Sequence, residues 1–126
     1  MGQHDDRMIC VVDDDASLRR SVRNLLMSVG FRVETFASAE EFLESRAVEM
    51  SCGCVVLDVR MTGMTGIELV RHLAAAGSRI PVIILTAHAD DQTRRQALEA
   101  GAVAFFEKPV RTAAFLDAVR MALSSA

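Results

Sequence analysis

Acidic side chains follow two of the apolar runs in this 126-residue sequence, at the point where each run ends. Asp13 and Asp14 come directly after the run 8–12, and Asp58 comes directly after the run 54–57. Carboxylates without histidine or cysteine partners select a hard cation, and a set of two or three favours Mg²⁺. Two like charges about 4 Å apart repel by roughly 4 kcal/mol at an effective dielectric constant near 20, so the acids need a cation. The pattern predicts a Mg²⁺ site if the acids meet in space.

A hydroxyl and an ammonium group stand at the ends of two further runs. Thr86 ends the run that begins at residue 80, and Lys108, the only lysine of the chain, follows the run 103–106. Mg²⁺ with a lysine and a hydroxyl opposite is suited to positioning and neutralising a phosphoryl group. An Asp can itself attack phosphorus to form an aspartyl phosphate, and Asp58 is the expected acceptor because its run is the central one. No GxxxxGK[ST] or GxGxxG loop occurs, so ATP is not the expected donor.

Several of these features have ordinary explanations when each is taken alone. An Asp at a strand end often caps the following helix, and this is the expected role of Asp15. His72 falls on a predicted helix and His88 in a loop, and neither is an expected metal ligand. The three cysteines are odd in number and two lie within apolar runs, which predicts buried free thiols rather than disulfides.

Short apolar runs alternate with segments of helical periodicity five times along the chain, which predicts the elements that must position these side chains. Runs that are apolar throughout indicate parallel strands covered by helices on both faces. The expected strands are 8–12, 31–36, 54–57, 80–85 and 103–106. The expected helices are 18–29, a short one opened by a capping box at 38–41, then 67–76, 90–100 and 112–123.

The fold class that follows is α/β, a single doubly wound (βα)5 flavodoxin-like domain with a parallel five-stranded sheet in the order 2-1-3-4-5. The functional crevice of such a sheet lies outside the carboxyl ends of its strands. Strands one, three, four and five are neighbours in this order. The polar residues at their ends are therefore expected to converge on one edge.

Composition restricts the class of protein further. The chain is 51% hydrophobic and 25% charged with a net charge of -3, which fits one globular domain and gives no basic surface for nucleic acid. No apolar run approaches the roughly 18 residues of a membrane helix. The first ten residues show no secretory signal, so we expect a cytoplasmic location without membrane association.

Four motifs resemble those of the receiver domain of bacterial two-component response regulators. They are VVDDD at 11–15, VVLDVRMTGMTG at 55–66, ILTAH at 84–88 and FFEKP at 105–109. Details such as DVRM and AGAVAFFEKP look most like the FixJ-like branch, in which a DNA-binding output domain follows in a longer chain. The resemblance covers essentially the whole chain and implies one receiver domain over 1–126, with a sensor histidine kinase or phosphotransfer protein as partner.

The resemblance also implies roles for the residues of the acidic site. Asp58 corresponds to the phosphoacceptor, and Lys108 to the lysine that contacts the phosphoryl oxygens. Asp14, Asp58 and the backbone carbonyl of Arg60 correspond to the direct Mg²⁺ ligands, while Asp13 would act mainly through metal-bound water. The domain would not be a classical enzyme, because it assists only its own phosphorylation and dephosphorylation.

By the same resemblance, Thr86 is the switch hydroxyl and Phe105 the switch aromatic residue. Phosphorylation would draw Thr86 toward the phosphoryl group, let Phe105 turn inward and reshape the face of helix 4, strand 5 and helix 5. A phosphorylation-dependent homodimer is the expected consequence. The sequence departs from the family at Thr62, where a proline usually stands, so the loop is expected to be less rigid.

Other functions on a doubly wound sheet fit the sequence less well. A phosphatase of the haloacid-dehalogenase kind also uses an Asp nucleophile and Mg²⁺, but it needs DxDx[TV] where this chain has DDDAS. Such a phosphatase also carries a cap or substrate loop, for which 126 residues leave little room. A flavin carrier would need a phosphate loop rich in Ser and Thr after the first strand, and a binding module without phosphorylation would not need the whole polar set.

Overall fold

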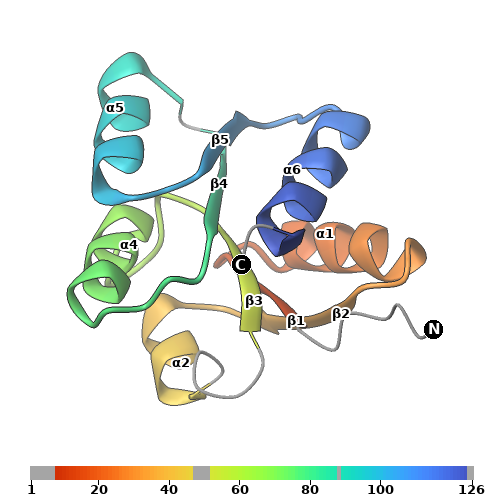
Figure 1. Cartoon of the computed structure of the whole chain (residues 1–126), viewed down its shortest axis with the longest axis horizontal. Helices are drawn as coiled ribbons and strands as arrows, with labels where there is room; N and C mark the ends of the chain where they lie inside the picture. Colours follow the sequence, from red (N-terminus) through yellow and green to blue (C-terminus); the bar gives the residue numbers. More distant parts are fainter. Residues whose placement is uncertain (1–7, 47–51, 88, 125–126) are drawn as a thin grey trace.

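The computed structural model describes residues 8–46, 52–87 and 89–124, and its strands form one parallel sheet (Figure 1). The sheet order is β2-β1-β3-β4-β5. The strands are β1 (Met8–Val12), β2 (Arg32–Phe36), β3 (Cys52–Leu57), β4 (Val82–Thr86) and β5 (Ala104–Glu107). The sheet order and the alternation of strands with helices confirm the predicted fold class.

Helices cover both faces of the sheet. They are α1 (Ala16–Ser28), α2 (Ala39–Glu44), α4 (Gly66–Ala75), α5 (Asp91–Ala100) and α6 (Thr112–Ser124). Figure 1 shows α1 and α6 on one face and α2, α4 and α5 on the other. Each face has its own cluster of buried apolar side chains, as expected for strands such as β1 and β3 that are buried along their whole length. Within the described residues, no helix is both long enough and apolar enough to span a membrane.

The first half of β3 differs from the prediction, which placed this strand at 54–57. The strand begins at Cys52, and its pairing with β1 shifts between Met8 and Ile9, so that Gly53 is an extra residue in β3. A glycine with no side chain to pack interrupts the apolar pattern, which is why the predicted strand started after it. The start of β3 is therefore a bulge rather than a regular strand end.

The last strand is displaced by one residue from the predicted range 103–106. Val103 donates its N–H to the Val82 carbonyl at 2.8 Å, but its side chain is 58% exposed and lies before the regular strand. At the other end β5 includes Glu107, which pairs with Thr86. The strand therefore extends to the residue before Lys108 and brings this lysine to the carboxyl edge of the sheet.

Helix caps explain two of the helix starts. Asp15 is the N-cap of α1 and accepts from the Ser17 and Leu18 N–H groups, as predicted. The capping box expected at 38–41 is only half present. Ser38 accepts from Glu41 N–H, but the Glu41 carboxylate accepts from the N–H of Ala37 and not from that of Ser38.

The cysteines are free thiols, as predicted, and all three lie on β1 or β3. Cys10, Cys52 and Cys54 are buried. Burial raises the pKa of Cys54 to about 12, so this thiol stays protonated at neutral pH. Its position in the sheet indicates a packing role.

Candidate functional site

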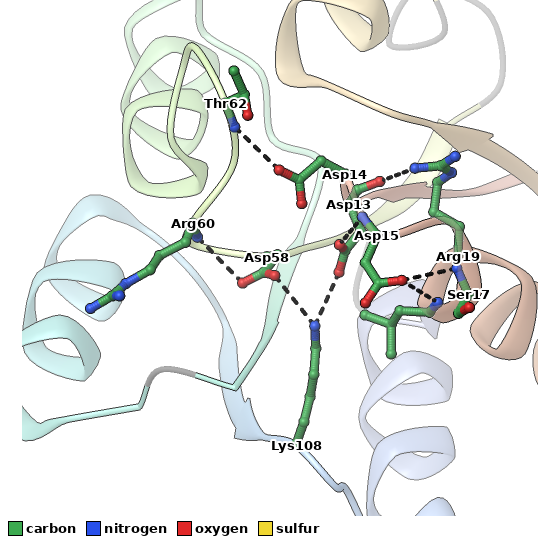
Figure 2. A network of polar contacts seen from close by, with 10 residues as sticks. Asp13, Asp14, Asp15, Ser17, Arg19, Asp58, Arg60, Thr62 and Lys108 are labelled. Atoms are coloured by element: carbon green, nitrogen blue, oxygen red, sulfur yellow. Dashed lines mark hydrogen bonds and ion pairs between the residues drawn. The ribbon is translucent and has the colours of Figure 1, made fainter.

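Three of the predicted polar residues meet at the carboxyl edge of the sheet (Figure 2). The Lys108 ammonium lies 3.2 Å from Asp13 Oδ2 and 3.3 Å from Asp58 Oδ2. Asp13 is 2% exposed and Asp58 7% exposed, whereas the Lys108 side chain is 18% exposed. Lys108 therefore bridges two nearly buried carboxylates, and its own side chain is more exposed than either of theirs.

Backbone hydrogen bonds beyond the strand ends fix the positions of these three residues. Asp13 N–H donates to the Phe36 carbonyl at 3.1 Å, and Asp58 N–H donates to the Val12 carbonyl at 3.2 Å. Lys108 N–H donates to the Thr86 carbonyl at 2.9 Å. Each residue thus continues the hydrogen bonding of its strand by one position. The sheet itself holds the site in place.

The Asp13 carboxylate is held by its own turn as well as by Lys108. Asp13 Oδ1 accepts from Asp15 N–H at 2.9 Å, and the Asp13 backbone carbonyl accepts from Arg19 Nη1 at 2.6 Å. Burial nevertheless raises the pKa of Asp13, because desolvation of the charge outweighs the favourable contacts with the Asp15 N–H and Lys108. The nearby Asp58 charge acts in the same direction as burial.

Asp14 has a different partner from the other two acids, which both contact Lys108. It is exposed, and its Oδ2 accepts from Thr62 N–H at 3.3 Å. No group of three or more His, Cys, Asp or Glu side chains is close enough to hold a metal ion among residues 8–46, 52–87 and 89–124. The cation that joins Asp13 and Asp58 here is the Lys108 ammonium.

The loop between β3 and α4 carries Arg60, the residue expected to offer its carbonyl to a metal. Arg60 N–H donates to Asp58 Oδ1 at 3.3 Å, and the Arg60 side chain is exposed. Further along this loop, Met64 N–H donates to Glu40 Oε2 at 2.9 Å, and this bond lowers the pKa of Glu40. The sequence analysis missed Glu40, because a single acid in the first turn of a helix gives no signal of a contact 24 residues away.

Gly66 is a second residue of the site that the sequence analysis did not single out. It is the first residue of α4, and its N–H donates to the Val59 carbonyl at 2.9 Å. A Cβ at this position would overlap the backbone carbonyl oxygen of Asp58 and would lie 2.6 Å from Leu57 Cδ1. The start of α4 therefore packs directly against the backbone of Asp58. The reciprocal capping box of Thr65 and Glu68 fixes the helix at that point.

The two residues expected to act as a switch lie on neighbouring strands. Thr86 is fully buried at the end of β4, and Phe105 on β5 is 8% exposed. The guanidinium of Arg94 lies 5.8 Å from the centre of the Phe105 ring. Because the ring is already packed in the cluster under α4 and α5, the expected inward turn of Phe105 is not needed to bury it.

Of the two histidines that the sequence analysis considered, the structure describes His72. His72 is exposed on α4, away from the acidic site. His88 lies outside the described residues. The contacts of the acidic site within the described residues come from carboxylates, backbone groups, Arg19 and Lys108.

The raised pKa of Asp13 predicts a stability gain from Asp13→Asn at neutral pH without metal. A carboxyl whose pKa is raised by folding binds its proton more tightly in the folded state, so ionisation destabilises the protein as pH rises through that pKa. The Asn side chain still has an oxygen that can accept from the Asp15 N–H. Lys108 still has the Asp58 carboxylate as an ion-pair partner. Urea unfolding followed by circular dichroism in a chelator should show a larger unfolding free energy for the variant at pH 7. The difference should close as pH falls below the ordinary range of Asp, and exposed Asp15→Asn should show no such trend.

Comparison with known proteins identifies the family to which this fold and site belong. The family profile described as response regulator receiver domain matches residues 9–120. The chain belongs to this family, whose members are signalling switches of two-component systems and not classical enzymes.

Two relatives and one solved structure show where the similarity lies. The transcriptional regulatory protein TdiR of Thauera aromatica is 45% identical over 118 residues, which are 92% of this chain and 51% of TdiR. The transcriptional regulatory protein FixJ of Bradyrhizobium diazoefficiens is 44% identical over 118 residues, 90% of this chain and 57% of FixJ. The crystal structure of FixJ-N superimposes with a TM-score of 0.89 at 36% identity and covers 98% of both chains. The chain spans about half the length of the curated relatives that it matches.

Proposed function

We propose that residues 1–126 form one receiver domain that accepts a phosphoryl group on Asp58 from a partner histidine kinase or phosphotransfer protein. The observation that carries this proposal is the position of Asp58 at the end of the central strand, with its carboxylate 3.3 Å from the Lys108 ammonium. An Asp58 oxygen attacks phosphorus and the bond from phosphorus to the donor nitrogen breaks. The donor histidine leaves with that electron pair, and an acyl phosphate forms on Asp58.

Lys108 would neutralise charge on the phosphoryl group once it is attached. The ammonium now interacts with two carboxylates, and phosphorylation converts one of them into a dianionic phosphate on the same side chain. A lysine is a compact point charge on a flexible stem, so it can follow the new oxygens while remaining near Asp13. The ion pair seen here therefore supports Lys108 as the residue that contacts the phosphoryl oxygens.

The donor chemistry of the site fits Mg²⁺. Asp14, Asp58 and the Arg60 backbone carbonyl would hold the ion, with Asp13 beside them, since all these donors are hard oxygen atoms. The ion would supply positive charge to the phosphoryl oxygens during transfer. Of the two carboxylates now joined to Lys108, that of Asp58 is the more exposed, and Asp14 is exposed to solvent.

We further propose that the phosphorylated site acts on the face of α5, β5 and α6, which is the helix 4, strand 5, helix 5 face of the sequence analysis. Thr86 and Lys108 are linked through the backbone, because Lys108 N–H donates to the Thr86 carbonyl. Phe105 lies two residues before Glu107, the partner of Thr86 in the β4–β5 pairing. A displacement of Thr86 would thus be transmitted to Phe105, to the Arg94 side chain over the Phe105 ring and to the surface of α5. Pairing with a second receiver or control of a DNA-binding output domain in a longer chain would follow, without direct nucleic acid binding by this domain.

The test of the proposed function is incubation with acetyl phosphate, with and without Mg²⁺, followed by intact-mass measurement. We expect one added phosphoryl group, formed only with Mg²⁺ and removed by hydroxylamine, which cleaves acyl phosphates but leaves phosphate esters of Ser and Thr. No addition, or addition resistant to hydroxylamine, would contradict the proposal. Continuous turnover of a phosphate monoester would instead indicate a phosphatase.

A further inference from the structure

Two backbone N–H groups tie the loop between β3 and α4 to carboxylates from other parts of the fold. Thr62 N–H donates to Asp14 Oδ2 at 3.3 Å, and Met64 N–H donates to Glu40 Oε2 at 2.9 Å. The first of these carboxylates belongs to the proposed metal site, and the second comes from the start of α2. The two ties should therefore respond differently when a cation binds.

A cation at the proposed site would compete with the Thr62 N–H for the Asp14 carboxylate. Mg²⁺ demands nearly octahedral geometry with oxygen atoms at about 2.0–2.1 Å, which is far stricter than the geometry of a hydrogen bond. Figure 2 shows the Asp14 carboxylate bonded to Thr62 N–H, while Asp13 and Asp58 are bonded to Lys108. These acids form no metal-binding group of three in the described part of the chain. A bound cation would also repel the positive end of the Thr62 N–H dipole.

We propose that the Thr62 backbone N–H competes with Mg²⁺ for the Asp14 carboxylate, so that metal binding releases the loop at Thr62. The inference rests on the metal site of the proposed function. Every residue except proline carries this N–H group, and proline is the usual residue here in the family that the sequence resembles. The competition is therefore a property of having Thr62 at this position.

The second tie would keep the released loop in place. Glu40 Oε2 lies so close to Gly63 that a Cβ there would be 2.7 Å from it, and Gly63 has a φ of +83°. Both features require a glycine at position 63, directly before Met64. Since Glu40 takes no part in the metal site, the loop would move at Thr62 while Met64 stays bound. Metal binding would thus change this loop at Thr62 and not at Met64.

Two substitutions at Thr62 separate the backbone N–H from the side chain. Thr62→Pro removes the N–H, whereas Thr62→Ala removes the side-chain hydroxyl and keeps the N–H. We expect Mg²⁺ to bind Thr62→Pro about two- to tenfold more tightly than wild type, the range that one net hydrogen bond corresponds to. Thr62→Ala should bind as wild type does. Affinities come from the shifts of backbone amide signals in an NMR titration of each folded variant with Mg²⁺.

Hydrogen exchange in the wild-type chain distinguishes competition from simple stiffening of the loop by proline. Ligand binding normally slows amide exchange, because it stabilises the folded state. The proposal predicts the opposite for Thr62, whose amide should exchange faster with solvent when Mg²⁺ is bound. The Met64 amide, held by Glu40, is the internal control and should not exchange faster. Solvent-exchange NMR measures both amides in one sample, and this result stands even if Thr62→Pro does not fold.

Each other outcome decides against the inference in a recognisable way. Weaker binding by Thr62→Pro would show that the N–H positions Asp14 for the metal instead of competing for it. Equal binding by all three chains, or slower exchange at Thr62, would show that Asp14 binds metal without leaving the loop. Those results would leave the proposed function intact. Absence of Mg²⁺ binding in wild type would remove the metal site, and the inference with it.

Discussion

Asp58→Asn should remain folded and gain no phosphoryl group from acetyl phosphate, whereas the wild-type chain gains one. The amide of Asn is not a nucleophile toward phosphorus, so the effect is a complete loss and not a reduced rate. The substitution keeps the size of the side chain and leaves an oxygen that can accept from the Arg60 N–H. It also removes a charge that disfavours ionisation of the buried Asp13, so a large loss of stability is not expected. Intact mass and circular dichroism measure the two properties on the same samples.

The matched control for this variant is Asp15→Asn. Asp15 is the third residue of the acidic stretch 13–15, but it caps α1 and faces solvent. Asn is as good an N-cap as Asp, so this control should keep both the helix and the phosphorylation. Incorporation into Asp58→Asn equal to that of Asp15→Asn would place the acceptor on another residue.

Asp58→Asn also tests the proposed relay. Beryllofluoride with Mg²⁺ mimics a phosphoryl group on a carboxylate, so it should promote association of the wild-type chain in light scattering and have no effect on Asp58→Asn. Thr86→Ala should still bind the mimic and fail to associate, because the variant lacks the hydroxyl that we propose responds to the phosphoryl oxygens. An unchanged mass for wild type would contradict the relay while leaving the acceptor assignment untouched.

The carboxyl edge of the sheet could be predicted from sequence because it depends on where apolar runs end. Asp13 and Asp58 each follow a fully buried strand and Lys108 follows β5, and neighbouring parallel strands must bring such residues together. The direction in which the Asp14 side chain points could not be predicted in this way. Whether an exposed carboxylate turns toward a metal site or toward a loop N–H depends on the path of that loop, which no periodic pattern encodes.

Contacts that depend on the close approach of two segments of the chain also could not be predicted from the sequence. Glu40 reads as an ordinary acid in the first turn of a helix, where it suits the helix dipole whether or not it touches anything else. Only the fold brings the start of α2 beside the loop after β3, so that Glu40 meets Met64. Gly66 likewise reads as a residue of the turn before a helix. Its importance depends on the distance between two backbones.

Gly66→Ala should be among the most destabilising single-methyl substitutions in the chain. The added Cβ would overlap the Asp58 carbonyl oxygen, and the backbone of Asp58 is fixed in the sheet through its bond to Val12. Neither backbone can move aside as a flexible side chain would. Overpacking of this kind costs about 1–3 kcal/mol and occasionally more, against a gain in helix propensity of at most about 1 kcal/mol. We expect a net loss of about 2 kcal/mol, against the 5–15 kcal/mol typical of a domain.

Gly77→Ala separates this overlap from the general effect of replacing glycine. Gly77 has a φ of +80°, but a Cβ there meets nothing within 4 Å. Its replacement should cost only the backbone strain of about 1 kcal/mol. Because the chain has no Trp or Tyr, urea unfolding is followed by far-ultraviolet circular dichroism. If Gly66→Ala loses no more stability than Gly77→Ala, α4 can shift away from Asp58. The loop between Asp58 and α4 would then be adjustable at two points, at Thr62 and at the start of α4, and the sheet alone would fix the proposed acceptor.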